Sequence, residues 1–404
     1  MIADVMMAAC GALALLLFAG TYRLAGVVFV WAALFPIYSV GTLPPVLFDL
    51  VRYGLAVAIG VRALHLPTAA PWRFARPWAL TLLGLGVWLT VVGYARPDPL
   101  DTRSGVTMLL AVACAWFALH RLPNPRSVLT GFATGAVISA LVLIATAAGL
   151  GPAVALVPVS DAGVMRLTGL GPSATKVASD LGMAALVLGV LAAIERRGRL
   201  LNAAGTGICI AGLLLSGGRV GLAMLVLACS WLLLRGRLRA RHALMAAAAA
   251  LAIVWWLARQ GLALSTLDRL VQTGPHGFST GRVELNAYAL AATFDGFLAN
   301  GTTAFALEYG GTPHFAPLSF GVAGGAVAFI AGAFLVAALL RELVRDRPTL
   351  NIGVLAALAA YTIIEPSGAF VGLSSVTLLL SVIRAEPACP FEGRRPARLL
   401  TSQN

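Results

Sequence analysis

About thirteen apolar runs dominate this chain, and each is long enough to cross or nearly cross a lipid bilayer, which takes about 20 helical residues. Their approximate centres are Leu13, Ala33, Ala56, Leu85, Ala113, Ile138, Leu186, Cys209, Val226, Ala250, Phe329, Ala357 and Leu378. A soluble domain is excluded, since 59% of the 404 residues are hydrophobic and only 11% are charged. The sequence therefore predicts an all-α fold, a polytopic membrane helix bundle of about 12–13 spans. We expect it to form a single membrane domain over residues 1–404.

The net charge of +13 is concentrated in short connections between the apolar runs. These arginines have no interleaved aromatic residues, so the pattern indicates the positive-inside bias of membrane proteins and not nucleic-acid binding. The connections predicted to be cytoplasmic are Arg62–Arg76, Arg121–Arg126, Glu195–Arg199, Arg235–Arg241 and Arg341–Arg347. Alternation then places Gly151–Thr175, Ser216–Arg219 and Arg259–Pro317 on the opposite side.

The five cysteines and the N-terminus point to no further chemistry. The cysteines form no CxxC pair, so neither a thiol site nor a bound metal is indicated. The first apolar run follows Asp4 without a preceding lysine or arginine, which is a poor signal-peptide pattern. We expect this run to remain as a membrane segment.

The longest hydrophilic connection, Arg259–Pro317, is predicted to be an ordered, partly helical extracytoplasmic loop. Ser265 and Thr266 can cap a short helix that ends at Leu270. Ser279 and Thr280 can cap a second helix from Arg282 through Phe294, which Gly296 then breaks. His314 follows near the end of the loop, just before Pro317 and the next span. Histidine exchanges a proton near neutral pH, so His314 is a candidate general base.

Four cations on this side point to an anionic ligand. Arg219 opens the apolar run Val220–Leu234, and Arg282 opens the loop helix, so both lie at the helix end where the dipole disfavours a positive charge. Arg166 and Lys176 add two further cations. Guanidinium groups bind phosphate through two parallel hydrogen bonds, and so many cations favour a diphosphate over a lone carboxylate.

Each of these cations also has a structural alternative. Arg219 can anchor its helix to lipid phosphates. Arg282 can pair with Glu284 or Asp295, and Lys176 can pair with Asp180 one helical turn later. A further pair, Asp49 with Arg52, has the spacing of an internal ion pair on one helix. We expect this pair of Asp49 and Arg52 to have only a structural role.

The order of these motifs resembles the family of O-antigen ligases and Wzy-type O-antigen and exopolysaccharide polymerases, which are bacterial membrane glycosyltransferases. The resemblance covers roughly the C-terminal 60% of the chain. It includes Arg166 with the Gly-Pro-Ser that follows, Leu215-Ser216-Gly217-Gly218-Arg219, Gly281-Arg282 and His314 with Gly325. The sequence departs from the family pattern at Gly218, Phe315 and Ala328.

The resemblance implies a fold similar to the GT-C glycosyltransferases and a metal-independent, inverting transfer of a glycan from undecaprenyl diphosphate. His314, Arg219 and Arg282 would be the catalytic residues, while Arg166 and Lys176 would bind the diphosphate. No cofactor is implied. The partners would be the lipid-linked glycan donor, a glycan or lipid A core acceptor, membrane lipids and a chain-length regulator or flippase of the same pathway. The resemblance places the multi-pass protein in the bacterial inner membrane with a periplasmic active site.

The family contains two activities that differ in their acceptor. Two of the departures fall on the histidine motif typical of the ligases, so we favour a surface polysaccharide polymerase over an O-antigen ligase that acts on lipid A core. The alternative from another class is a flippase or secondary transporter of lipid-linked sugars. Transporters usually place their charges near the membrane midplane and often have repeated halves, and neither feature is found in this sequence.

Overall fold

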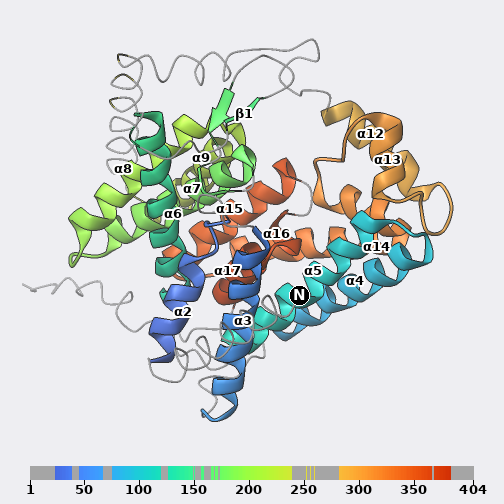
Figure 1. Ribbon diagram of the computed structural model, residues 1–404, viewed down its shortest axis with the longest axis horizontal. Helices are drawn as coiled ribbons and strands as arrows, with labels where there is room; N and C mark the ends of the chain where they lie inside the picture. Colours follow the sequence, from blue (N-terminus) through green and yellow to red (C-terminus); the bar gives the residue numbers. More distant parts are fainter. Residues whose placement is uncertain are drawn as a thin grey trace, which may run out of the picture.

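The computed structural model is helical apart from one short two-stranded ribbon (Figure 1). It describes residues 23–38, 45–66, 75–119, 126–148, 150, 156–158, 165–167, 169–171, 173–238, 252, 255, 259, 282–365 and 368–383. Statements below about contacts refer to these residues. The ribbon pairs β1 (Leu156–Pro158) with β2 (Met165–Leu167) in antiparallel register, an addition to the expected all-α fold.

Within the described residues, six helices are long and apolar enough to cross a membrane: α4 (Arg76–Ala95), α5 (Pro99–Leu119), α6 (Arg126–Ala147), α7 (Ala174–Ile194), α8 (Arg199–Ser216) and α14 (Ala316–Val344). They pack with α2 (Leu24–Ala33), α3 (Pro45–Leu64), α9 (Arg219–Leu234), α15 (Thr349–Ile364) and α17 (Leu373–Ile383). Every predicted run centre falls in one of these helices except Leu13 and Ala250, which lie outside the described residues. The prediction of a multi-pass membrane helix bundle is thereby confirmed.

Small residues allow the central helices to approach each other closely. A side chain at Gly221 of α9 would overlap the backbone carbonyl of Ala178 on α7, and one at Gly218 would overlap the Ala178 methyl group. A side chain at Gly182 of α7 would likewise collide with the Gly221 carbonyl. Such contacts are typical of membrane helices, because packing rather than the hydrophobic effect drives their association. They fix the start of α9 against the first turns of α7.

Connections that the sequence assigns to the cytoplasmic side meet at one end of the bundle, which we call the basic end. Arg126 at the start of α6 forms an ion pair with Glu195 at the end of α7. Arg237 after α9 forms an ion pair with Asp346 after α14. Arg235 donates to the Val344 carbonyl at 3.0 Å. Each of these contacts joins two connections that were predicted to share a side.

At the opposite end of the bundle, which we call the distal end, the connection before α7, assigned to the other side, and the start of α7 contact two further parts of the chain. The Tyr38 amide, between α2 and α3, donates to the Leu170 carbonyl in the connection before α7 at 2.6 Å. At the start of α7, the Lys176 Nζ atom lies 3.3 Å from the Ser374 hydroxyl at the start of α17. The predicted sorting of connections into two groups therefore agrees with the fold.

The apolar run expected to form one span after His314 forms two helical segments. Gly324 and Gly325 interrupt α14 with non-helical backbone angles, and Gly325 has φ +69°. The segments fold back on each other, because a side chain at Gly332 would lie 3.1 Å from the Pro317 Cα atom. In a straight helix these two residues would be roughly 22 Å apart, at 1.5 Å per residue. Residues 316–323 therefore form a short segment that packs back against the long segment, residues 326–344.

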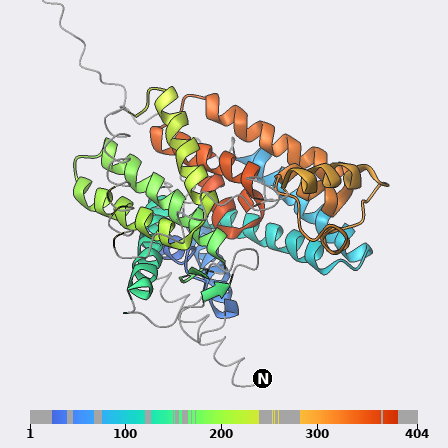
Figure 2. The same cartoon turned by 90° about the horizontal axis from the view of Figure 1, so that it is seen from above.

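Residues 316–323 form a separate unit with α12 (Arg282–Phe294) and α13 (Thr302–Tyr309), which we call the cap. The cap has its own small core of Ala289, Phe305, Leu318 and Val322. Thr293 of α12 packs against Gly321, where a side chain would collide with it. Figures 1 and 2 both show α12 and α13 beside the turn between α4 and α5, at one end of the molecule.

Candidate functional site

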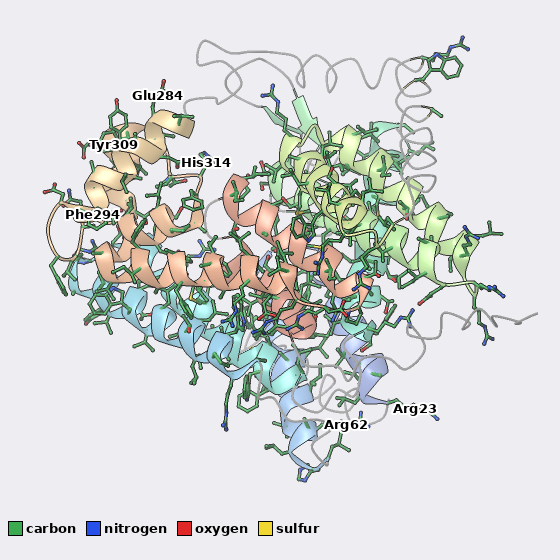
Figure 3. All side chains as sticks on the ribbon, turned by 180° about the vertical axis from the view of Figure 1, so that it is seen from behind. Arg23, Arg62, Glu284, Phe294, Tyr309 and His314 are labelled. Carbon is green, nitrogen blue, oxygen red and sulfur yellow. The ribbon has the colours of Figure 1, made fainter. Side chains whose placement is uncertain are left out.

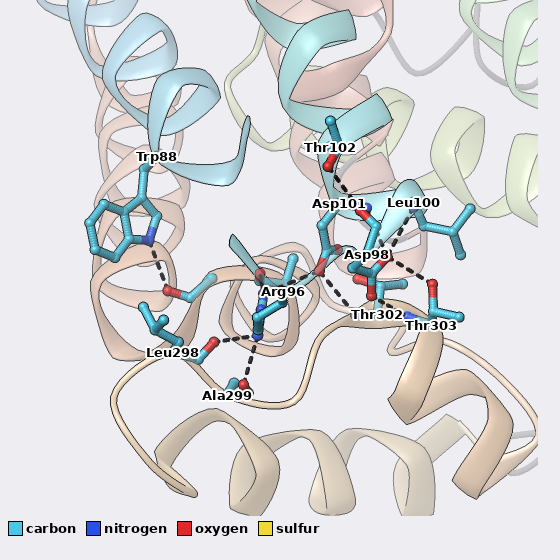
Figure 4. A network of polar contacts seen from close by, with 12 residues as sticks. Trp88, Arg96, Asp98, Leu100, Asp101, Thr102, Leu298, Ala299, Thr302 and Thr303 are labelled. Carbon is cyan, nitrogen blue, oxygen red and sulfur yellow. Dashed lines mark hydrogen bonds and ion pairs between the residues drawn. The ribbon is translucent and has the colours of Figure 1, made fainter. Parts of the chain in front are cut away.

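A buried polar network attaches the cap to the turn between α4 and α5 (Figure 4). The N-cap residue of α13 is Gly301, which offers no capping side chain. Two carboxylates take this role, one from the turn and one from the first turn of α5. Asp98 accepts hydrogen bonds from the Thr303 amide at 2.9 Å and from its hydroxyl at 2.7 Å. Asp101 accepts from the Thr302 amide at 3.2 Å. Negative charge at a helix N-terminus stabilises the helix through its dipole.

Arg96 completes this network by satisfying backbone carbonyls that no helix or sheet pairs. Its guanidinium donates to the carbonyls of Leu298 at 2.6 Å and Ala299 at 2.7 Å, and it forms a 3.2 Å ion pair with Asp101. It also donates to the Ala323 carbonyl, which the reversal in α14 leaves without a helical partner. The cap and the reversal are thus held by one side chain that offers five donors.

The environment of Asp98 keeps its carboxylate charged. Burial raises the pKa of this carboxyl, but the hydrogen bonds from Thr303 and from the backbone amides of Asp101 and Leu100 outweigh it and leave the pKa below its usual value. Hydrogen bonds to an ionised acceptor are stronger than neutral ones. The charge of Asp98 therefore strengthens the attachment of the cap.

His314 lies in the short connection between α13 and α14 and is held by its backbone. Its amide donates to the Asn286 side chain on α12 at 2.9 Å. The preceding carbonyl, of Pro313, accepts from the Ser319 hydroxyl at 3.1 Å. His314 is partly exposed, and Figure 3 shows it on the flank of the cap nearer the rest of the bundle, whereas Tyr309 and Phe294 lie on the other flank.

His314 is recessed from the tip of the distal end. Pro317 lies opposite Gly332. Gly332 follows the reversal at Gly325 by seven residues, which corresponds to roughly 10 Å of helix. The sequence placed His314 directly before a span, at the membrane surface. The fold-back of residues 316–323 explains the different position, because this short segment carries His314 back alongside the long one.

The predicted helix from Arg282 through Phe294 is confirmed as α12, and Arg282 is its first residue. Arg282 and Asn286 are four residues apart, so they occupy the same face of α12. Asn286 holds the backbone of His314, and the start of α12 therefore lies next to the candidate base. The side chain of Arg282 lies outside the described part of the chain, as do the predicted caps at Ser265, Thr266, Ser279 and Thr280 and the helix end at Leu270.

Arg219 is the first residue of α9, as predicted, and is partly exposed. The chain turns sharply before it, because Gly217 ends α8 with φ +63°. Gly218 has ordinary extended angles, but any side chain there would collide with Ala178 of α7. The departure from the family pattern at Gly218 thus has a packing reason. Arg219 lies at the distal end, beside the first turns of α7.

The structure places Lys176 in a structural ion pair. Its Nζ atom lies 2.5 Å from a carboxylate oxygen of Asp180, as the i,i+4 alternative predicted, and both side chains are largely buried. Ser374 supplies a further contact. Because one carboxylate already balances its charge, Lys176 has little to offer a diphosphate. The diphosphate-binding role given to Lys176 by the resemblance loses support.

Arg166 lies in strand β2, opposite Val157 of β1. Its side chain is outside the described residues. The strand packs against α8, whose last residue, Ser216, is three positions before Arg219. The predicted pair of Asp49 with Arg52 is confirmed at 2.7 Å, and Arg52 also donates to the Leu34 carbonyl at 3.0 Å.

The reversal in α14 explains which residues occupy two positions of the family's histidine motif, Gly325 and Ala328. Gly325 has a left-handed conformation, and a side chain there would overlap the Phe297 carbonyl. Ala328 is fully buried, and its methyl group fills the space beside Gly324. A residue larger than alanine at position 328 would therefore disturb the backbone at the reversal.

The candidate residues fall into two groups at the distal end. His314 and Arg282 belong to the cap, which packs on α14. Arg166, Lys176 and Arg219 surround the start of α7 and α9, and α15 packs against α14, α7 and α9. Within the described ranges, no three His, Cys, Asp or Glu side chains are grouped so that they could hold a metal ion.

The residues that the sequence analysis missed are Arg96, Asp98 and Asp101. Their signal was available, since these three charges lie together in the short connection between two apolar runs and include both acidic and basic residues. Comparison of the sequence with models of known protein families finds no match, and comparison with curated proteins finds none either. The functional assignment therefore depends on the residues and geometry described above.

Proposed function

We propose that this protein is an integral membrane glycosyltransferase that transfers a glycan from undecaprenyl diphosphate to an acceptor hydroxyl. The reaction takes place at the distal end of the bundle, on the periplasmic face of the bacterial inner membrane. The acceptor is a second lipid-linked glycan, so the protein is a surface polysaccharide polymerase. The alternative acceptor, lipid A core, would make it an O-antigen ligase.

One observation carries this proposal: the candidate base and the candidate cations lie at the end of the bundle opposite the basic connections. His314 lies in the short connection between α13 and α14, and Arg219 is the first residue of α9, directly after the turn from α8. A diphosphate would offset the unfavourable placement of an arginine at the positive end of a helix dipole. Charges at one end of the bundle also favour an enzyme over a transporter, which usually binds its substrate near the membrane midplane.

The proposed reaction is a single displacement. The His314 imidazole takes the proton of the acceptor hydroxyl while its oxygen forms a bond to the anomeric carbon of the donor. The bond from that carbon to the diphosphate oxygen breaks, and undecaprenyl diphosphate leaves with the electron pair. Arg219 and Arg282 stabilise the negative charge that grows on the leaving group. Because attack and departure occur on opposite faces, the anomeric configuration inverts.

The remaining residues have supporting roles in this proposal. Arg166 contributes positive charge near the donor diphosphate. Lys176 stabilises the start of α7 through Asp180 and does not bind the donor. The network of Arg96, Asp98 and Asp101 keeps the cap, and with it His314, in a fixed position. Positioning of this kind matters because small displacements of a catalytic group can lower the rate by large factors.

A cysteine-labelling experiment tests the side on which the proposed reaction takes place. In a chain whose five native cysteines are replaced by alanine, Thr312→Cys should react with a membrane-impermeant thiol reagent in intact spheroplasts. Arg197→Cys, an exposed position at the basic end, should react only after permeabilisation. Labelling of Thr312→Cys that requires permeabilisation would place the cap in the cytoplasm and refute a periplasmic reaction.

A further inference from the structure

A cavity of about 390 Å³ opens in the cap between α12, α13 and the start of α14. Its wall contains three aromatic and three polar side chains: Phe294, Phe305, Tyr309, Asp295, Asn300 and Glu308. Small-molecule sites in proteins typically have volumes of about 300–1,000 Å³. The cavity lies on the flank of the cap that carries Tyr309 and Phe294, away from His314 (Figure 3).

The aromatic side of this cavity is fixed by ring contacts. Tyr309 stacks on Tyr288 with ring centroids 4.7 Å apart and an angle of 16° between the rings. Phe305, which is buried, contacts Tyr309 from another direction at 4.7 Å. Phe294 packs edge-on against Phe329 at 5.6 Å. Rings that are held in place in this way offer apolar surface at low entropic cost.

The polar side of the cavity restricts the charge of a ligand. Asp295 and Glu308 are exposed carboxylates that can only accept hydrogen bonds, and the Asn300 amide can both donate and accept. The described residues of its wall include no lysine, arginine or histidine. A phosphate would therefore be repelled. A neutral ligand with several hydroxyl donors and one apolar face fits both sides of the cavity, and a sugar ring has this combination.

We propose that this cavity is a saccharide subsite that binds a sugar of the acceptor glycan, remote from the sugar whose hydroxyl reacts. The inference rests on the proposed function for the identity of the glycan. The acceptor is favoured over the donor because the cap carries the candidate base, which takes the proton of the acceptor hydroxyl. Asn286, which holds His314, precedes Ala291 and Phe294 of the cavity wall by roughly 8 and 12 Å along α12.

A binding experiment tests the subsite without requiring transfer. The probe is the surface polysaccharide of the source strain, released from lipid by mild acid and cut to short oligosaccharides. Saturation-transfer NMR with the purified full-length protein should give signals from the ring protons of the probe. Glu308→Ala and Asp295→Ala should each weaken binding about tenfold or more, since each removes a hydrogen bond to a charged acceptor.

The matched control is Glu284→Ala, which removes an exposed carboxylate of α12 that lies outside the cavity. It should bind the probe as the unchanged protein does. The subsite would be overturned if Glu308→Ala and Asp295→Ala bind the probe as tightly as the control Glu284→Ala. Displacement of the probe by putrescine or Mg²⁺ at low concentration would also overturn it, because the cavity would then be a cation site.

Transfer kinetics separate this inference from the proposed function. In a transfer assay, Glu308→Ala should raise the KM for the acceptor while kcat and the KM for the donor stay near their original values. Transfer with an unchanged acceptor KM would refute the subsite and leave the proposed function intact. Binding that depends on Glu308, in a protein that transfers nothing, would refute the proposed function and leave the subsite intact.

Discussion

Replacement of His314 with alanine should lower the rate of glycan transfer by about 10²–10⁴ while the protein is still inserted and expressed at normal levels. The expected loss is large because no other group is proposed to take the proton from the acceptor hydroxyl. Folding should be preserved, since the contact with Asn286 is made by the His314 backbone and not by its imidazole. The measurement is the length of surface polysaccharide in a deletion strain that carries the variant, together with membrane levels of the protein.

The matched control for this variant is His276→Ala. His276 belongs to the same predicted loop but lies outside the described residues, and the proposal gives it no role. Cells with His276→Ala should make polysaccharide of normal length. Near-normal polymer in cells that carry His314→Ala at normal levels would show that His314 is not the base.

At Arg219, both Arg219→Ala and Arg219→Lys should reduce transfer by about 10²–10³, the usual effect of removing one donor from a group that stabilises transition-state charge. The lysine variant is expected to be nearly as poor as the alanine variant, because an ammonium group cannot form two parallel hydrogen bonds to a diphosphate. The measurement is kcat with purified protein and a lipid-diphosphate glycan.

The control is Arg103→Lys, an exposed arginine on α5 for which no role is proposed. It should retain the original kcat. Arg282→Lys should have a milder effect than Arg219→Lys if Arg282 pairs locally with Glu284 or Asp295. Full activity of Arg219→Lys beside an inactive Arg219→Ala would show that charge alone matters and that the bidentate contact is wrong.

The sequence predicted those parts of the fold that depend on local signals. The start of α9 at Arg219 follows from two glycines before an apolar run, and the end of α12 at Phe294 follows from Gly296. Helix positions follow from apolar runs because a bilayer requires every backbone group to be satisfied within its own helix. Sidedness follows from charge, and the contacts of Arg126 with Glu195 and of Arg237 with Asp346 agree with it.

The sequence could not predict the features that depend on contacts between distant parts of the chain. Arg96 holds carbonyls more than 200 positions away, and no local pattern encodes such a pair. The reversal at Gly324 and Gly325 is hidden in an apolar run of 29 residues, because both halves of the run are equally apolar. As a result, the recessed position of His314 was not foreseen.

For the candidate residues, the sequence predicted their positions at helix starts better than their arrangement in space. Arg219 and Arg282 occupy helix starts as expected, because glycines mark both. The sequence left two roles open for Lys176. Its spacing to Asp180 suits an ion pair, and its position suits a contact with a ligand. Only the packing of α7 against its neighbours, which buries both side chains, favours the ion pair.

The central claim is most directly tested by a transfer assay with purified protein in lipid vesicles, an undecaprenyl-diphosphate glycan as donor, and a second lipid-linked glycan as acceptor. The described part of the cap offers no grouping of metal ligands, and Arg219 and Arg282 are proposed to supply the positive charge for the leaving group. The account predicts lengthened glycan with an inverted anomeric linkage, release of undecaprenyl diphosphate, and an undiminished rate in excess EDTA. Strict dependence on a divalent ion, or movement of the donor across the vesicle without transfer, would contradict it.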